Sequence, residues 1–420
     1  MPIVESISLH DLVVSESIND VKAYIVNNTD IDIDIQDENG CTPLMLAVKN
    51  NNIDIAAYLI EMGANVNARD FTMLTPYLCS AANGFHEILA LTLASGADIN
   101  SVNRFGGTAL LPSSEKGFLR TVQVSLNAGI PVNHINKLGW SALLEAVILG
   151  DGGYLYSDII KELITAGADI DLKDRDGNSA LKHAHTKEQL YVIELMSNYD
   201  AADQLFSTNI HKIRTHIRNF DYDKALALLE EQQCDDDISC YYYLGYVLTE
   251  LKRYECSISA YMKALEISPD KVEFYLYIAN SYRLNKNVSQ ALNAFDKGIE
   301  AKPENDFIRY HKSNYLRELG MHDEAVKEMT ILLKNQPNRY DYSFHKANSL
   351  RSLNLHEEAI SAIEYAITHD CTNALYYLHK AQSLELMGRN KQALIIIENA
   401  LLITEEHDDL NNLKEKLSAE

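Results

Sequence analysis

Three carboxylates, a histidine and a tryptophan in the first half of the chain have side chains suited to acid–base or ligand-binding chemistry. Glu115 and Glu145 each lie in a segment that we expect to be helical, and Asp151 lies in a glycine-rich stretch that follows the second segment. Two carboxyl groups held close together can act as acid and base, or can bind a small polar ligand. Ordinary solvated carboxylates are the alternative interpretation. The candidate ligand site comprises Glu115, His134, Trp140, Glu145 and Asp151.

A second set of candidate residues recurs along expected helices of the second half. Leu276, Asn280 and Arg283 are spaced by four and three residues, which places them on one helical face. Amides exchange hydrogen bonds with a peptide backbone, guanidinium groups bind carboxylates through two bonds, and aromatic rings add contact area. A plain solvated face is the alternative. The set, which we call the first-helix row, is Tyr242, Tyr246, Leu276, Asn280, Arg283, Tyr310, Asn314, Arg317, Phe344, Asn348, Arg351 and Gln382.

Motifs of catalytic, cofactor or metal sites are missing from the sequence. It has no phosphate-binding loop, dinucleotide fingerprint, zinc-protease motif or serine nucleophile elbow. His183 and His185 are two residues apart, so on a regular helix they point in different directions and cannot share one metal. We therefore expect no catalytic residues, no bound metal and no cofactor.

The six cysteines, at positions 41, 79, 234, 240, 256 and 371, form no C-x-x-C pair. Such scattering gives little support to a zinc site or to a disulfide framework. We expect buried or half-buried reduced thiols in a cytoplasmic protein.

The net charge of the chain argues against two classes of partner, nucleic acids and anionic membranes. The 420 residues include 60 acidic and 37 basic side chains, a formal net charge of −23. An excess of this size repels nucleic-acid phosphates and anionic lipids, so we expect neither as a partner. The start of the chain has no basic or apolar region typical of a signal peptide, and the longest aliphatic run, residues 394–397, is too short to span a bilayer.

Internal repeats position the first set of candidates. Gly-Ala-Asn-Val-Asn at 63–67 returns in related form at 96–100, 129–133 and 167–171. A second marker, Thr42-Pro43-Leu44, returns in the same register at 75, 108, 141 and 179. The threonine or serine should cap a short helix, and the glycine should end a second one. Each unit is too small to bury its own apolar face, so the copies must stack.

These markers resemble the ankyrin repeat, over about residues 30–190. Strings such as Leu138-Gly139-Trp140-Ser141 are similar to a bacterial subgroup of that family. Residues 4–28 should form an amphipathic helical pair that caps the array. The fourth copy has five extra residues around Gly150–Ser157, which we expect to bulge between its two helices.

A different repeat positions the first-helix row. Small residues recur at 225, 257, 291, 325, 359 and 393, and prolines recur at 269, 303 and 337. Small residues allow two antiparallel helices to cross closely. This pattern resembles the tetratricopeptide repeat over about residues 204–405, and in that family the first helices line a concave groove. His311, His345 and His379 also recur, each followed by lysine; this row could sense pH or could be a copied repeat unit.

Together the patterns predict an all-α double α-solenoid. Residues 1–200 would be an ankyrin-type domain with about five repeats, and residues 201–420 a tetratricopeptide-type domain with about six repeats and a capping helix. Both resemblances imply a non-catalytic scaffold for a protein or extended peptide. The arginines and asparagines of the first-helix row predict a partner with acidic groups or a free C-terminus. The alternative is a small-ligand sensor or enzyme that uses Glu115, Glu145 and Asp151.

Overall fold

The computed structural model of the chain divides into two compact units, Met1–Ala202 and Asp203–Glu420. It describes residues 8–28, 30–198, 208–232, 234, 236–403 and 408–419. Most of the expected join, near residues 198–203, lies outside the described residues. Within them, extended pairing is limited to two isolated bridges, Ile135–Ser141 and Lys173–Ser179, so the predicted all-α class is confirmed.

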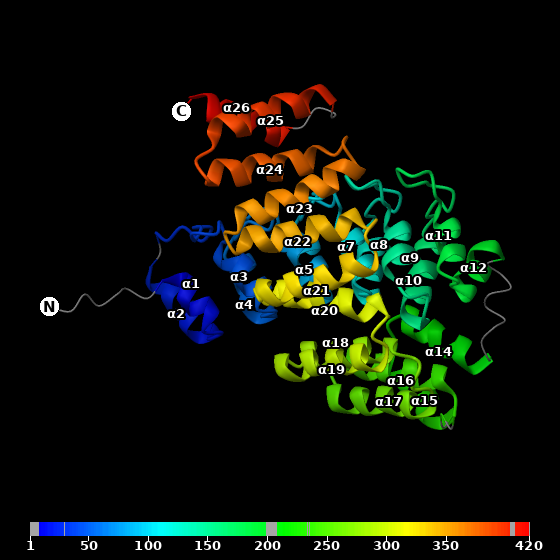
Figure 1. Ribbon diagram of the computed structural model, residues 1–420. Helices are drawn as coiled ribbons and strands as arrows, with labels where there is room; N and C mark the ends of the chain where they lie inside the picture. Colours follow the sequence, from blue (N-terminus) through cyan, green and yellow to red (C-terminus); the bar gives the residue numbers. More distant parts are fainter. Residues whose placement is uncertain are drawn as a thin grey trace. The chain divides into compact units, whose positions relative to one another are not determined.

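The first unit is a series of short antiparallel helix pairs (Figure 1). First helices contact first helices of the next copy, as in α3–α5 and α7–α9, and second helices do the same, as in α4–α6 and α8–α10. The helices are α1 (Leu9–Val14), α2 (Ile18–Asn27), α3 (Pro43–Lys49), α4 (Ile53–Glu61), α5 (Pro76–Ala82), α6 (His86–Ala94), α7 (Leu110–Glu115), α8 (Leu119–Asn127), α9 (Ala142–Leu149), α10 (Tyr154–Thr165), α11 (Ala180–Thr186) and α12 (Leu190–Ser197).

Hydroxyl caps begin four of the five first helices after the N-terminal pair. In each, the side chain of Thr42, Thr75, Ser141 or Ser179 accepts the N–H three residues further on. The expected cap at Thr108 is wrong, because α7 has no side-chain cap. Pro112 has no N–H to donate to the Thr108 carbonyl, and the Leu111 N–H donates there instead, at 3.2 Å. The third copy therefore begins with a tighter turn.

The five extra residues of the fourth copy lengthen its helices more than its loop. Helix α10 has 12 residues where α4, α6 and α8 have nine, and α9 has eight where α3 and α5 have seven. One further residue enters the α9–α10 loop, residues 150–153. The expectation of a bulge between the helices is thus largely wrong, because Leu155, Ile159 and Leu163 continue an apolar helical face that is buried.

The second unit contains longer helices, each of which contacts the next along the chain (Figure 1). They are α14 (Thr208–Arg218), α15 (Tyr222–Gln232), α16 (Ile238–Glu250), α17 (Tyr254–Ile267), α18 (Glu273–Leu284), α19 (Val288–Ala301), α20 (Asp306–Glu318), α21 (His322–Asn335), α22 (Tyr340–Ser352), α23 (His356–His369), α24 (Ala374–Leu386), α25 (Asn390–Ile403) and α26 (Asp408–Ala419). The contacts run in succession, as a solenoid requires.

Small residues lie at the helix crossings of this unit. Ser257, Ala291 and Ala325 are fully buried, as are their equivalents in the other copies. Gly245 allows the closest approach, since a Cβ atom built on it would lie 2.3 Å from the ring of Tyr261. A larger side chain at these positions would separate the two helices of its repeat.

The expectation of buried or half-buried reduced thiols is wrong for four of the six cysteines. Cys234 and Cys240 form a disulfide that connects the α15–α16 loop with the first turn of α16. The remaining cysteines are free; Cys41 and Cys79 are buried, whereas Cys256 and Cys371 are exposed. The sequence spacing of six residues carried no motif that would single out this pair.

No helix in the part of the chain that the structure describes combines the length and apolar character needed to cross a bilayer.

Candidate functional site

The first-helix row lies on α16, α18, α20, α22 and α24. Its aromatic and aliphatic members are buried rather than solvent-facing, and so are Asn314 and Asn348, with 3% and 6% of their surface exposed. Asn280, Arg283, Arg317, Arg351 and Gln382 are half-buried. The alternative of a plain solvated helix face is therefore wrong for most of the row.

Ring contacts between neighbouring first helices explain part of this burial. Tyr242 contacts Tyr277 of the next first helix at 5.3 Å between ring centroids. Tyr310 contacts Tyr342 at 5.5 Å, and Phe344 contacts Tyr376 at 4.9 Å. The expected ladder of aromatic groups therefore packs along its own array.

The arginines of the row bind side chains of their own unit. Arg317 donates to Asn314 Oδ1 at 2.5 Å and to His345 Nδ1 at 2.9 Å, so this histidine nitrogen must be an acceptor. Arg351 donates to Gln382 Oε1 at 2.7 Å. The guanidinium of Arg283 lies 3.9 Å from the Glu318 carboxylate. The arginines of the row therefore already have partners within the tetratricopeptide unit.

Among the residues that the structure describes, three nitrogen donors of the row nevertheless have no acceptor. They are Asn348 Nδ2, Arg317 Nε and Arg351 Nε, all buried atoms. The Oδ1 atom of Asn348 is occupied by His379 Nδ1 at 2.8 Å. Burial lowers the pKa of Arg351 to about 10. These neighbouring first helices, α20 and α22, thus present donors without acceptors.

The candidate ligand site of the first unit is only partly assembled. Asn136 Nδ2 donates to Glu145 Oε1 at 2.8 Å, while Glu145 Oε2 is buried without a donor. Burial raises the pKa of the Glu145 carboxyl well above its usual range, and the nearby Glu115 carboxylate raises it further. Glu115 and Glu145 therefore interact electrostatically, as two residues of one site would.

The other three members have separate surroundings. Asp151 Oδ1 accepts the Gly153 N–H at 2.9 Å, which shapes its own loop. His134 Nε2 contacts the Gly106 carbonyl at 2.6 Å, and Trp140 is packed in the core with 7% of its surface exposed. The carboxylates of Asp151 and Glu115 both raise the pKa of the buried phenol of Tyr156, after the larger effect of burial. No cluster of three metal-ligating side chains occurs among the residues the structure describes.

Comparison with known proteins identifies both arrays. Ankyrin repeat models match residues 39–71 and, as three copies, residues 77–174. An ankyrin repeat domain from Acinetobacter baumannii AYE is 44% identical, over 45% of this chain and 95% of that domain, with a TM-score of 0.44. The chain belongs to the ankyrin-repeat family. Its second unit contains tetratricopeptide repeats, matched at residues 238–271 and 310–374.

Two further solved structures are each similar to part of this chain. The ankyrin repeat protein EF0377 is 36% identical over 46% of this chain and 99% of its own, with a TM-score of 0.45. A structure of a predatory endopeptidase from Bdellovibrio bacteriovorus in complex with its immunity protein contains a chain that is 25% identical, over 46% of this chain and 97% of that one, with a TM-score of 0.41. No curated protein matches significantly. Ankyrin and tetratricopeptide repeats are generally protein-interaction modules.

A hairpin residue that sequence reasoning missed organises every ankyrin repeat. One side-chain oxygen accepts the N–H groups two and four residues further on. The residues are Asp37, Asp70, Asn103, Asn136 and Asp174. Their recurrence, five residues ahead of each threonine or serine marker, was the available signal. These oxygens satisfy backbone donors that the hairpins would otherwise leave without partners.

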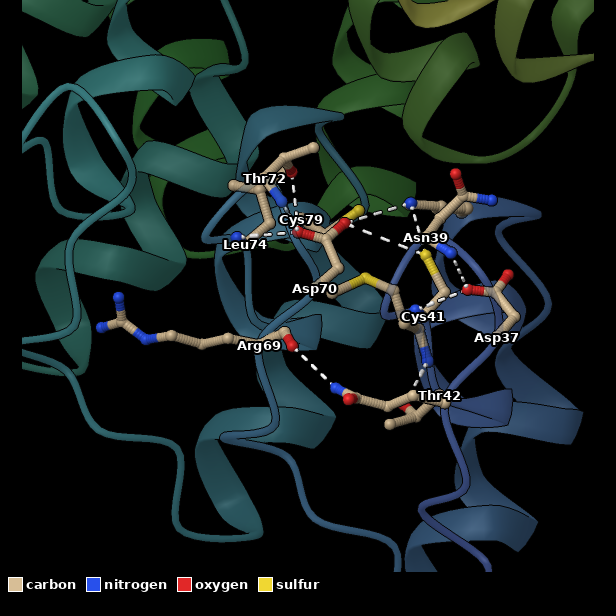
Figure 2. A network of polar contacts seen from close by, with 12 residues as sticks. Asp37, Asn39, Cys41, Thr42, Arg69, Asp70, Thr72, Leu74 and Cys79 are labelled. Atoms are coloured by element: carbon tan, nitrogen blue, oxygen red, sulfur yellow. Dashed lines mark hydrogen bonds and ion pairs between the residues drawn. The ribbon is translucent and has the colours of Figure 1, made fainter. Parts of the chain in front are cut away.

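The remaining side-chain atom of this hairpin residue contacts the first helix. Asp174 Oδ2 lies 2.6 Å from His183 Nε2, nine residues further on, which is the spacing between Asn136 and Glu145. Figure 2 shows Asp70 at the centre of a polar network with Thr72, Leu74 and Cys41. Asp70 Oδ2 also accepts from Lys49 Nζ, on the first helix of the preceding copy, at 3.2 Å. Glu145 and His183 therefore occupy equivalent positions, and part of the bonding of Glu145 is structural.

Proposed function

We propose that the tetratricopeptide-repeat unit binds an extended segment of a protein partner along the first-helix row. Supporting this are the three donors without acceptors on Arg317, Asn348 and Arg351. A buried donor that lacks a partner costs about 1–3 kcal/mol, and a ligand oxygen placed against it would remove that cost. The ligand should therefore present several hydrogen-bond acceptors to the first-helix row.

Backbone carbonyls, acidic side chains and a free C-terminal carboxylate are acceptors of this kind. A carboxylate also gains from the charge of the arginines, because charge-assisted hydrogen bonds are stronger than neutral ones. Extended chain exposes one carbonyl per residue at about 3.3–3.6 Å per step, which suits donors presented by successive helices. We infer a non-catalytic adaptor whose partner carries acidic groups or a free C-terminus.

Peptide selection tests this proposal. The full chain is used to select from a library of short segments with free C-termini, in parallel with an Asn348→Ala/Arg351→Ala double variant. Enrichment of acidic or C-terminal sequences on the parent alone would support the proposal. Arg389→Ala is the matched control, because Arg389 pairs with Glu357 outside the row, at 2.7 Å. If the parent and the double variant select the same peptides, the row is not the binding surface.

A second candidate function rests on the ankyrin unit. Glu145 Oε2 is a buried acceptor without a donor, and Glu115 adds negative charge nearby. A small cationic ligand would satisfy both groups, as in a ligand sensor. Methylammonium chloride should then raise the melting temperature of the parent more than sodium chloride does, and should not do so for Glu145→Gln. Equal shifts in both proteins would remove this candidate.

A further inference from the structure

Four lysines occupy the same position in consecutive copies of the tetratricopeptide array. Lys312, Lys346, Lys380 and Lys414 are 34 residues apart, on α20, α22, α24 and α26. Each lies on a first helix or on the capping helix that continues the array. The four lysines occupy the same position within their repeats. Differences in their surroundings therefore come from the identity of the neighbouring residues, and not from the placement of the helices.

Three of these lysines pair with an acid on the preceding second helix. Lys312 Nζ lies 2.7 Å from Asp296 Oδ1. Lys380 lies 2.8 Å from Glu364, and Lys414 lies 3.6 Å from Glu398. In each pair the acid is sixteen residues before the lysine. Lys312 has a second carboxylate partner, Glu328, at 2.7 Å.

Lys346 is the exception. The residue sixteen positions before it is Thr330, whose hydroxyl donates to the Val326 carbonyl of its own helix at 2.7 Å. The position equivalent to Glu328 is Ala362, which has no acceptor side chain. Among the residues described, Lys346 has neither an ion pair nor a hydrogen bond, although it is half-buried.

The missing carboxylates affect the pKa of the Lys346 amine. Burial lowers the pKa of Lys346, and no neighbouring carboxylate opposes that effect. Burial also tends to lower the pKa of Lys312, but its hydrogen bonds with Asp296 and Glu328 leave that pKa raised. A lower pKa increases the fraction of neutral amine at pH 7, and only the neutral amine is a nucleophile.

We propose that Lys346 is an acylation site, at which an activated acyl group such as an acyl phosphate reacts in preference to the equivalent lysines of the array. The Nζ lone pair attacks the acyl carbon and forms the new C–N bond. The bond from the acyl carbon to the phosphate oxygen breaks and its electron pair leaves with the phosphate. The amine loses one proton to water, and the product is a neutral amide.

The structural consequences of acylation also favour Lys346. Acylation removes the positive charge of a lysine. At Lys312 it would leave Asp296 without its cation and would remove one of the two cations that pair with Glu328, the other being Arg309. At Lys346 no carboxylate loses a partner. Neutralising a half-buried, unpaired charge removes a desolvation cost instead of creating one. The modified chain should therefore keep its fold.

Acetyl phosphate is the probe for this proposal. The full chain is incubated with it at neutral pH, and acetylation of the four lysines is followed by peptide mass spectrometry. Lys346 should react on the order of threefold to tenfold faster than Lys312 and Lys380, since the neutral fraction changes tenfold per pKa unit. Equal rates at Lys346 and Lys380 would overturn the proposal.

Two substitutions of Thr330 separate the effect of a nearby negative charge on the rate from the effect of accessibility. Thr330→Glu supplies the missing acid and should slow Lys346 to the rate of Lys380, whereas Thr330→Gln adds similar bulk without charge and should leave Lys346 fast. Thr330 is exposed, so both variants should fold. The reciprocal change, Glu364→Thr, should accelerate Lys380. If Thr330→Glu leaves the rate of Lys346 unchanged, the missing acid is not the cause and the proposal is wrong.

Discussion

The ankyrin and tetratricopeptide units join their repeats with different chemistry. In the ankyrin unit, most side chains that link two copies bind the backbone. The Asn133 side chain accepts the Asp169 N–H and donates to the Gly167 carbonyl, whereas the Lys49–Asp70 ion pair joins two side chains. In the tetratricopeptide unit, side chains bind side chains, as in Arg351–Gln382 and Lys380–Glu364.

This difference affects how easily a polar side chain can lose its partner through a substitution. A backbone partner is present whatever the sequence, so one suitable side chain is enough to complete an ankyrin contact. A side-chain partner can be lost by one substitution, as Thr330 shows at Lys346. Buried polar atoms without a hydrogen-bond partner nevertheless occur in the described residues of both units, including Thr121, Ser125 and Glu145 of the ankyrin unit.

The largest effect on stability is expected for substitution of Asp70, in an ankyrin hairpin. Its carboxylate is almost fully buried, accepts the N–H groups of Thr72 and Leu74, and pairs with Lys49. Asp70→Ala should lower the free energy of unfolding by about 3–5 kcal/mol, because a buried charge pair loses one partner and two amides lose their acceptor. Chemical denaturation of the full chain measures this.

Asp70→Asn is the control, because asparagine already serves this role at Asn103 and Asn136. It should retain the two backbone hydrogen bonds and lose only the ion pair with Lys49. Its destabilisation should be clearly smaller than that of Asp70→Ala. Equal losses for the two variants would show that the backbone hydrogen bonds do not dominate the ankyrin hairpin.

A smaller effect is expected at a tetratricopeptide helix crossing. Ala325 is fully buried where α20 and α21 cross, so Ala325→Phe should overpack the crossing and cost about 1–3 kcal/mol. The same change at Ala362, one repeat further on and outside the row of small residues, is a position control. An unchanged melting curve for Ala325→Phe would contradict the repeat register.

Much of the fold could be predicted from the sequence because repetition shows which residues are equivalent. The glycine and threonine markers located the ankyrin helices, and the small residues at 291, 325 and 359 located the crossings. The uncapped start of α7 was not foreseen, since it depends on which carbonyl Pro112 leaves without a donor. The repeat pattern predicts the structure of each copy, and an exception such as the start of α7 arises where a single residue departs from that pattern.

The candidate sites were harder to predict for a physical reason. Spacing placed Asn314, Arg317 and Asn348 on one face, but it could not show that Arg317 binds Asn314. Whether a polar group is occupied depends on residues 28–31 positions away, such as His345 for Arg317 and His379 for Asn348. Periodicity gives the face of a side chain, whereas its partner requires the packed structure.

A pH-dependent effect on stability is expected at Glu145, whose carboxyl is buried in the ankyrin unit. Its raised pKa means that the folded state binds more protons than the unfolded state above pH 4.5, the ordinary value of this carboxyl. The contribution to stability is present below that pH and is lost as pH rises through the folded pKa. Glu145→Gln should therefore raise the melting temperature by a few degrees at pH 7 and by less at pH 4.5. A difference that does not change with pH would contradict burial of a titrating carboxyl.

The most direct measurement is titration of a selected acidic peptide against the full chain at two salt concentrations. Arg351→Ala should weaken binding on the order of tenfold and reduce its salt dependence, because a charge contact is lost. Asn348→Ala should weaken binding without changing the salt dependence, because an amide is neutral, and the control Arg389→Ala should bind like the parent. If all three variants bind like the parent at both salt concentrations, the first-helix row does not bind the peptide and the account is contradicted.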